Sequence, residues 1–336
     1  MISEYLDAKV EYSRWLRRFG CVDAVGIGVG LRVVAGRRLP EPSIQVFVPR
    51  KTSRRMLSRR EQIPATIDGV AIDVLESASA VFSGLPSLEA PRTGPPSFSL
   101  RQGRAKRRPL EAGISCSNLY SCSGTLGCFC NGLNREGRQA TFILGCGHVL
   151  RGLESFKSSP AVIQASPSDG GTSRDQVATF ERNALLTAGP DGVNLCDAAI
   201  AEISPAIPYS NTILGIGAPS GKTEPQLGMP VLKAGRTTGV TKGVVTALAV
   251  ETWISWSIQD PSMRYRFVDL IRIDGETAGV PFALPGDSGA LVVAESSLAA
   301  VALYSAGTDQ GHYGLASPIS TVEKCLDVQI QSAAPA

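Results

Sequence analysis

Short apolar runs separated by turn residues fill the chain from about residue 113 onward. Segments such as ATFIL, AVIQAS, PVLKAG, RFVDLIRI and GALVVA alternate with glycine, proline and aspartate turns. Many short strands at near-regular intervals, with few helical patterns between them, are typical of an antiparallel β-sandwich or barrel. A helix is expected only near the end, over STVEKCLDV. We therefore predict one mainly β domain over residues 113–336.

The first part of the chain has a different pattern. MISEYLDAKVEYSRWLRRFG spaces its apolar residues as a helix does, and VDAVGIGVGLRVVAG and PSIQVFVPRK are typical of strands. The basic stretch KTSRRMLSRREQ is expected to form a second helix, and IPATIDGVAIDVLES a turn and a strand. Residues 1–83 are therefore predicted to form a small α/β N-terminal domain.

A linker is predicted between these two regions. Residues 84–112, GLPSLEAPRTGPPSFSLRQGRAKRRPLEA, are first rich in proline and then basic. Such composition is typical of a segment between folded units. The basic run GRAKRR is more consistent with solvated charge than with a docking site.

Composition excludes some classes of function. Of 336 residues, 43% are apolar and 19% charged, and the net charge of +3 is too small to imply a nucleic-acid partner. The N-terminal helix pattern lacks the apolar core of a secretory signal, and no run is apolar enough to span a bilayer. We expect a cytoplasmic protein without membrane or nucleic-acid partners, whose eight cysteines are mostly reduced and buried.

A buried carboxylate is the first candidate for chemistry. Asp197 opens the apolar run AAIA, which predicts a buried strand. A lone buried carboxylate costs several kcal/mol, so Asp197 needs a partner that shares or neutralises its charge. The chain has only two histidines, His148 in GCGHVL and His312, so the choice of an imidazole partner is narrow.

A serine in a glycine-flanked turn is the second candidate. Ser288 lies in the sequence Gly286-Asp287-Ser288-Gly289. A serine hydroxyl becomes a nucleophile only when an adjacent base removes its proton. The glycines would let the backbone N–H groups of Gly286 and Ser288 point at one spot, as an oxyanion hole requires. Alone, this motif is more often a tight polar turn.

The order of the three residues carries more weight than any one motif. His148, Asp197 and Ser288 follow the order of a chymotrypsin-type triad, which subtilisins and α/β-hydrolases do not share. These motifs resemble those of trypsin/chymotrypsin-like serine proteases, and GRTTG (235–239) resembles a strand-entry motif of their bacterial branch. RPLEAGIS, SGTLGC, MPVLKAGRTTGVTKGVV and GLASPI are most similar to the subgroup containing the plant narrow-leaf protease and its bacterial relatives.

The resemblance implies a fold and a division of roles. It implies a chymotrypsin-like double β-barrel, preceded by the small α/β domain, with the triad between the barrels. His148 would be the general base, Asp197 its orienting group, Ser288 the nucleophile, and the amides of Gly286 and Ser288 the oxyanion hole. No cofactor is expected; the partner would be a protein or peptide substrate, and the subgroup suggests a homo-oligomer.

The same resemblance implies a substrate site. A substrate strand would add along Ser305, Ala306 and Gly307. Counting back six residues from Ser288 reaches Phe282, which predicts an apolar pocket floor and a preference for uncharged P1 residues. The chain departs from the pattern of these proteases in two ways. Val149 replaces the cysteine that commonly follows the histidine, and no new-N-terminus motif is present to pair with Asp287 after cleavage.

Two other interpretations remain open. Cys128-Phe129-Cys130 and Cys146-Gly147-His148 each place two potential ligands on one face of a strand, and three thiolates with one imidazole can hold structural zinc. Alternatively, the chain is a catalytically silent protease-fold scaffold that binds partners. Labelling of Ser288 by a fluorophosphonate separates the protease from the zinc protein, and the effect of Ser288→Ala on a partner-dependent phenotype separates it from the scaffold.

Overall fold

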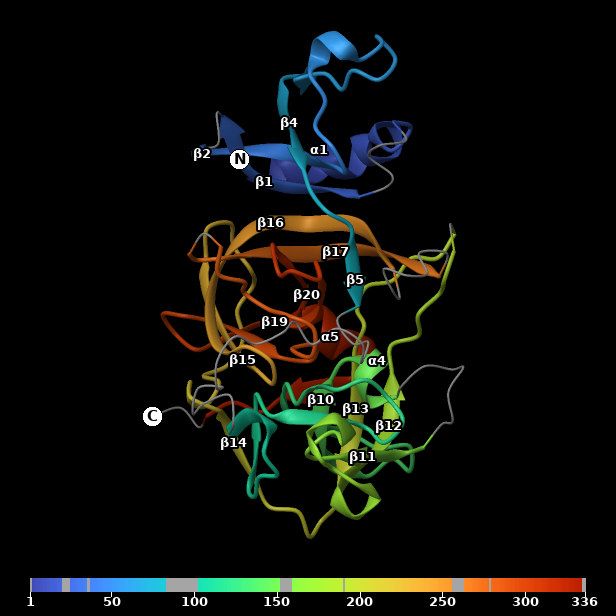
Figure 1. Ribbon diagram of the computed structural model, residues 1–336, viewed down its shortest axis with the longest axis vertical. Helices are drawn as coiled ribbons and strands as arrows, with labels where there is room; N and C mark the ends of the chain where they lie inside the picture. The colour runs from blue at the N-terminus through green and yellow to red at the C-terminus, as the bar shows by residue number, and fades with distance from the viewer. Residues whose placement is uncertain are drawn as a thin grey trace.

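The computed structural model describes residues 2–19, 25–34, 37–82, 102–151, 159–189, 191–255, 263–277 and 279–333. The chain is mainly β, as predicted (Figure 1). Its described helices are α1 (Ile2–Leu16), α4 (Gly147–Leu150) and α5 (Ile319–Leu326), with the 3-10 turns η1 (Arg54–Met56), η2 (Pro167–Asp169) and η3 (Ser173–Asp175). No helix in these ranges is both long and apolar enough to cross a membrane.

The N-terminal region forms a small sheet covered by α1. Its strands are β1 (Gly26–Val34), β2 (Arg37–Val48), β3 (Thr66–Ile67) and β4 (Val70–Glu76). β1 and β2 are antiparallel, whereas β4 runs parallel to β2. Ala8 and Leu16 of α1 pack with Ile27, Ile44 and Val46, so the helical apolar spacing and the alternating strands bury one shared core.

One expectation for this region is wrong. The stretch KTSRRMLSRREQ forms only the short turn η1 and not a helix. Gln62 Nε2 donates to the carbonyls of Arg54 (3.1 Å) and Leu57 (2.9 Å), and Glu61 accepts from Ser58 N (2.9 Å). Side chains that satisfy nearby backbone groups in this way stabilise turns in place of a helical hydrogen-bond ladder.

The C-terminal half builds a closed barrel. Its strands are β15 (Pro230–Gly235), β16 (Gly239–Ser255), β17 (Arg264–Gly275), β18 (Leu291–Ala294), β19 (Ala300–Gly307) and β20 (Gly314–Pro318). The pairing order β15-β18-β19-β20-β17-β16 closes into a ring because β15 also pairs with β16. All these pairings are antiparallel, as expected from the short alternating runs.

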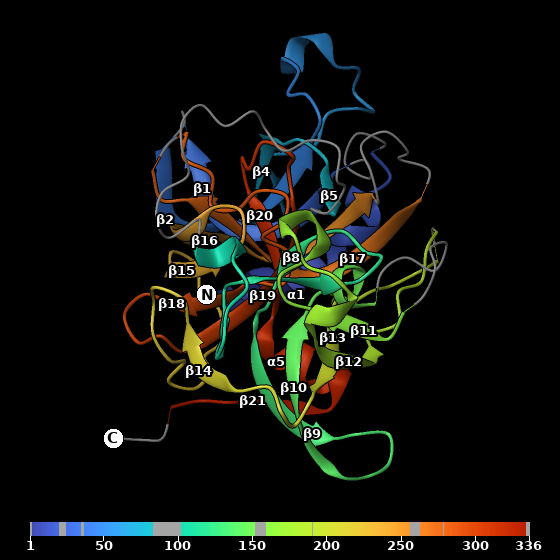
Figure 2. The ribbon, with the colours of Figure 1, turned by 60° about the horizontal axis from the view of Figure 1, so that its bottom comes forward.

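The middle of the chain forms an 8-stranded sheet, brought forward in Figure 2. Its strands are β7 (Ser115–Asn118), β8 (Gly124–Thr125), β9 (Cys128–Leu133), β10 (Gln139–Gly145), β11 (Ala161–Ile163), β12 (Gln176–Asn183), β13 (Ala199–Ile203) and β21 (Val328–Ile330). The buried core of this sheet includes Phe142, Val162 and Ile200, and α5 joins it through Val322 and Leu326. The predicted C-terminal helix is confirmed by α5.

The last part of the predicted linker, residues 102–112, belongs to the folded structure. Residues 84–101 lie outside the described ranges, but β6 (Leu110–Ala112) pairs in parallel with β14 (Tyr209–Ile213). The basic run beside it is bound to its surroundings: Lys106 pairs with Asp175 and Arg107 with Glu111. Apolar burial of Leu110 and these ion pairs hold this end in place.

The N-terminal sheet and the barrel are joined by strand pairing. β1 pairs antiparallel with β16, so one sheet of 11 strands runs from the N-terminal region into the barrel. β5 (Ala80–Phe82) enters the barrel itself, where it pairs in parallel with β16 and antiparallel with β19. Glu251 of β16 adds ion pairs to Lys9 (3.6 Å) and Arg17 (2.6 Å). Burial lowers the pKa of Lys9, and Glu251 opposes that shift.

Candidate active site

His148 lies on α4, the single helical turn that follows β10. The glycine before it has a definite role. A Cβ atom at Gly147 would lie 2.6 Å from Asp197 Oδ1, so only glycine leaves room for the carboxylate at this point. The GCGH motif therefore shapes the backbone to receive Asp197.

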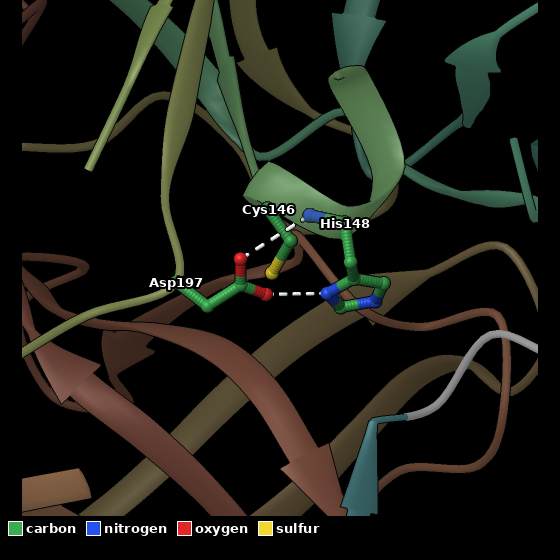
Figure 3. Close-up of side chains that lie close together, drawn as sticks. All are labelled: Cys146, His148 and Asp197. Carbon is green, nitrogen blue, oxygen red and sulfur yellow. Dashed lines mark hydrogen bonds and ion pairs between the residues drawn. The ribbon is translucent and has the colours of Figure 1, made fainter. Parts of the chain in front are cut away.

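Asp197 holds His148 at two atoms (Figure 3). Its Oδ2 is hydrogen bonded to His148 Nδ1, and its Oδ1 accepts from the backbone N–H of His148 at 3.2 Å. Both side chains are 1% exposed. Antiparallel pairing of Gly145 with Ala199 brings the end of β10 beside the start of β13, which explains how residues so far apart in the sequence meet. The predicted partner of the buried carboxylate is therefore His148.

Ser288 lies in the turn that leads into β18, with no exposed surface. Its Oγ donates to the carbonyl oxygen of Ser305 on β19 at 3.1 Å. Its own carbonyl accepts from Thr125 N at 2.8 Å, which ties the serine turn to the other sheet. The serine therefore lies at the junction between the two sheets.

Tyr304 joins the serine turn to the histidine turn. Its carbonyl oxygen accepts from Gly289 N at 2.8 Å and from Cys146 Sγ at 3.2 Å. Gly289 directly follows Ser288, and Cys146 lies two residues before His148. The serine turn and the histidine turn thus share Tyr304 O as a hydrogen-bond acceptor, and the meeting of Ser288 with His148 stays a prediction.

Asp287, next to the serine, is anchored from within the chain. Its carboxylate accepts from Thr237 N (2.8 Å), Leu284 N (3.0 Å) and Thr238 Oγ1 (2.6 Å). Lys233 Nζ lies 3.3 Å from Asp287 Oδ2. Burial lowers the pKa of Lys233, while Asp287 raises it. Sequence reasoning missed Lys233, whose ammonium group is the buried counter-ion of Asp287.

Gly286 requires glycine on two counts. Its φ is +99°, a region that side chains disfavour, and a Cβ there would collide with Thr237 Oγ1. Thr237 Oγ1 donates to Pro285 O (2.7 Å), and Thr125 Oγ1 donates to Gly286 O (2.9 Å). The backbone around the predicted oxyanion-hole amides of Gly286 and Ser288 is thus held on both sides. Their role stays a prediction.

The predicted substrate-binding residues fall in two settings. Phe282 is fully buried in the barrel core, with Lys233 Nζ 5.6 Å from its ring centroid. The Phe282 ring is packed inside this core. Its role as the floor of an apolar substrate pocket stays a prediction. Ser305, Ala306 and Gly307 lie at the end of β19, and Ser305 O accepts from Ser288 Oγ. Their role in substrate binding stays a prediction.

Phe82 is a site residue that sequence reasoning missed. Its ring centroid lies 5.1 Å from that of His148, although it belongs to β5 of the N-terminal region. Within β5, it is paired with Ala306 of β19. The only sequence signal was a lone aromatic residue at the end of the N-terminal region.

The four potential zinc ligands of the alternative interpretation, Cys128, Cys130, Cys146 and His148, are not brought together. In the described ranges, Cys146, His148 and Asp197 are the one group of three potential ligands that lie together. The Cys130 thiol points to Phe142 O (3.9 Å) and the Cys146 thiol to Tyr304 O. Burial raises the pKa of the Cys128, Cys130 and Cys146 thiols.

Known proteins are similar to parts of this chain, and the solved structures are similar at low sequence identity. A family model described as the NARROW LEAF 1 N-terminal domain matches residues 5–75, in keeping with the resemblance seen in the sequence. No curated protein sequence matches the chain.

Solved structures of bacterial serine proteases are similar to about two thirds of this chain. Thermobifida fusca protease A is 15% identical, with a TM-score of 0.44, over 67% of this chain and 100% of that one. For Nocardiopsis protease the identity is 19% and the TM-score 0.44, over 66% and 100%. For Cellulomonas bogoriensis chymotrypsin they are 17% and 0.42, over 67% and 100%. At these values the likeness carries no argument about activity, which depends on the site itself.

Proposed function

We propose that this chain is a serine endopeptidase that cleaves peptide bonds through an acyl-enzyme intermediate. The observation that carries the proposal is that Asp197 binds both the backbone N–H and Nδ1 of His148. The turn that contains Ser288 is fixed by the buried ion pair of Asp287 with Lys233. A buried carboxylate bound to imidazole Nδ1 sets the tautomer and stabilises the imidazolium that forms during acyl transfer. The link between the serine turn and the histidine turn through Tyr304 O supports the proposal.

Each residue has one step in the proposed reaction. Ser288 Oγ attacks the carbonyl carbon of the scissile peptide bond while His148 takes the hydroxyl proton at Nε2. The imidazolium then gives that proton to the leaving amine, which leaves an ester on Ser288. Water hydrolyses the ester by the same route in reverse, and the amides of Gly286 and Ser288 stabilise the oxyanion in both halves.

A partner-binding scaffold is the second candidate. It is favoured by the burial of both reacting groups, since Ser288 is 0% and His148 3% exposed. A silent scaffold would keep its partners when Ser288 is replaced, whereas a protease would lose its products. The substrate, a homo-oligomeric state and a cytoplasmic location stay predictions.

Covalent labelling tests the proposal. A fluorophosphonate should label the wild-type protein at Ser288, identified by peptide mass spectrometry. Ser288→Ala should abolish labelling, whereas Ser296→Ala, at an exposed serine of the following turn, should leave it unchanged. A survey of new protein termini in cells with wild type or Ser288→Ala would then identify substrates. Failure of the wild type to label under any condition, including those described below, would reject the protease.

A further inference from the structure

β18 pairs with only the first part of one edge of β19, and β5 pairs with the end of that same edge. β18 pairs with the first half of β19, and β20 pairs along the opposite edge. At Ala306 and Gly307, β20 is still present on one side, and β5 takes the other. β18 and β5 therefore occupy the same edge of β19, one after the other.

Ser288 lies between those two strands. β18 begins at Leu291, and the turn before it donates from Gly289 N to Tyr304 O. The next carbonyl along β19, that of Ser305, accepts from Ser288 Oγ. Antiparallel pairing of Val81 with Gly307 and of Phe82 with Ala306 directs β5 toward Ser305. A peptide that adds to this edge meets the nucleophile, and β5 already occupies the edge.

The side chains of β5 fit this position closely. Ala80 and Phe82 are buried with Ile254, Phe267 and Leu315 in a single apolar cluster. Phe82 also makes edge contacts with the rings of Tyr265 (5.9 Å) and Phe267 (5.8 Å).

The chain just before β5 is also fixed. Tyr313 Oη donates to the carbonyl of Ala78 at 2.6 Å, and burial raises the pKa of Tyr313. Figure 1 shows β5 reaching from the N-terminal layer toward the part of the barrel near α4. The N-terminal region thus delivers a strand to His148.

We propose that Ala80-Val81-Phe82 is an internal ligand that holds the substrate-binding edge of β19 closed. This inference rests on the proposed function. An extended peptide adds to an exposed sheet edge through its main chain, and only one strand can use that edge at a time. The protein is therefore latent until β5 is displaced, and activation consists in moving this strand rather than in cutting the chain before the catalytic region.

The occupant also indicates the substrate class. The surface that receives Phe82 is made of aromatic and aliphatic side chains, and the position of Ala80 is fully enclosed. A substrate that replaces β5 is an extended apolar segment with an aromatic residue against His148 and a small residue two positions before it.

Replacing Phe82 tests the latent state. Phe82→Ala removes the ring next to His148, and Phe82→Leu keeps an apolar side chain there if the alanine variant folds poorly. Both should raise the rate of fluorophosphonate labelling of Ser288 by roughly tenfold or more, because the open state becomes more populated. Phe19→Ala, which removes a ring in edge-to-face contact with Trp15 within the N-terminal region, is the matched control and should leave the rate unchanged. Circular dichroism checks folding of each variant.

A binding measurement separates this inference from the proposed function. A fluorescent peptide of sequence SASAVF, residues 77–82, is titrated into Ser288→Ala with and without Phe82→Leu. The Phe82 variant should bind the peptide roughly tenfold more tightly. Equal affinity in both proteins, or slower labelling of the Phe82 variants than of wild type, overturns the internal-ligand inference. Tighter peptide binding without labelling of any variant supports the occupied edge and rejects the protease.

Discussion

Lys233 Nζ lies 3.3 Å from the carboxylate of Asp287, and both side chains are completely buried. Asp287 directly precedes Ser288, so this pair fixes the nucleophile turn from inside the barrel. Lys233 lies on β15, and Thr237 and Thr238 follow that strand to bind the same carboxylate. The segment KAGRTTG is therefore one anchor for the serine turn.

Removal of Lys233 should be costly. Lys233→Met leaves the Asp287 charge buried without its counter-ion, and breaking such a pair typically costs about 3–5 kcal/mol. Urea denaturation should show that loss, and fluorophosphonate labelling of Ser288 should slow. Lys242→Met, which removes a half-exposed partner of Glu295, should change stability by less than about 1 kcal/mol. Equal stability of the two variants would contradict the anchoring role.

Asp197→Asn should separate catalysis from folding. An asparagine amide keeps most of the shape but no longer favours the tautomer or the imidazolium, which in comparable triads lowers the rate by about 10⁴-fold. The expected result is nearly complete loss of Ser288 labelling, while circular dichroism still reports a folded chain. Asp309→Asn, at an exposed position, serves as the control. Retained labelling in Asp197→Asn would show that His148 works without its carboxylate.

Gly286→Ala should destabilise the serine turn by about 3 kcal/mol or more, because backbone strain and a collision with Thr237 Oγ1 act together. Gly137→Ala provides the comparison. Gly137 also has a positive φ, +75°, but a Cβ there meets nothing within 4 Å. It should cost about 1 kcal/mol from strain alone. The difference between the two urea midpoints measures the crowding at Gly286, and equal midpoints would contradict it.

Asp175 should contribute stability that is lost only in strong acid. A hydrogen bond from Lys106, with further ones from Thr172, lowers the pKa of Asp175 to about 2 from 3.8. Because the folded pKa lies below the unfolded one, the contribution is complete above roughly pH 4 and disappears as the pH falls toward 2. Urea midpoints of wild type and Asp175→Asn should therefore differ at pH 7 and converge near pH 2. A difference that does not depend on pH would show that the carboxylate charge is not the cause.

Much of this fold was predictable from local patterns. The short alternating runs predicted the strands of the barrel, and the apolar run after Asp197 predicted β13. The cost of burying a carboxylate and the scarcity of histidine limited the partner of Asp197 to His148 or His312, and the order of the three motifs favoured His148. Each of these inferences depends on local spacing or on a strong energetic constraint.

Other features depend on contacts that no local pattern reveals. β5 is only three residues long, too short for a period to be recognised, and its place comes from pairing with strands far along the chain. Lys233 reads as an ordinary strand residue, and its role appears only when the barrel closes around Asp287. The helix expected over residues 51–62 failed because polar side chains compete for its backbone groups.

Strand β16, 17 residues long, has β1 along part of its length. A chain shortened to begin after β5 would leave that stretch of backbone N–H and C=O groups without partners, and long bare edges of this kind recruit other molecules into aggregates. The N-terminal region thus covers an aggregation-prone edge of β16 and also supplies β5. Any event that pulls β5 from the barrel while leaving β1 in place would open the site and keep the protein soluble.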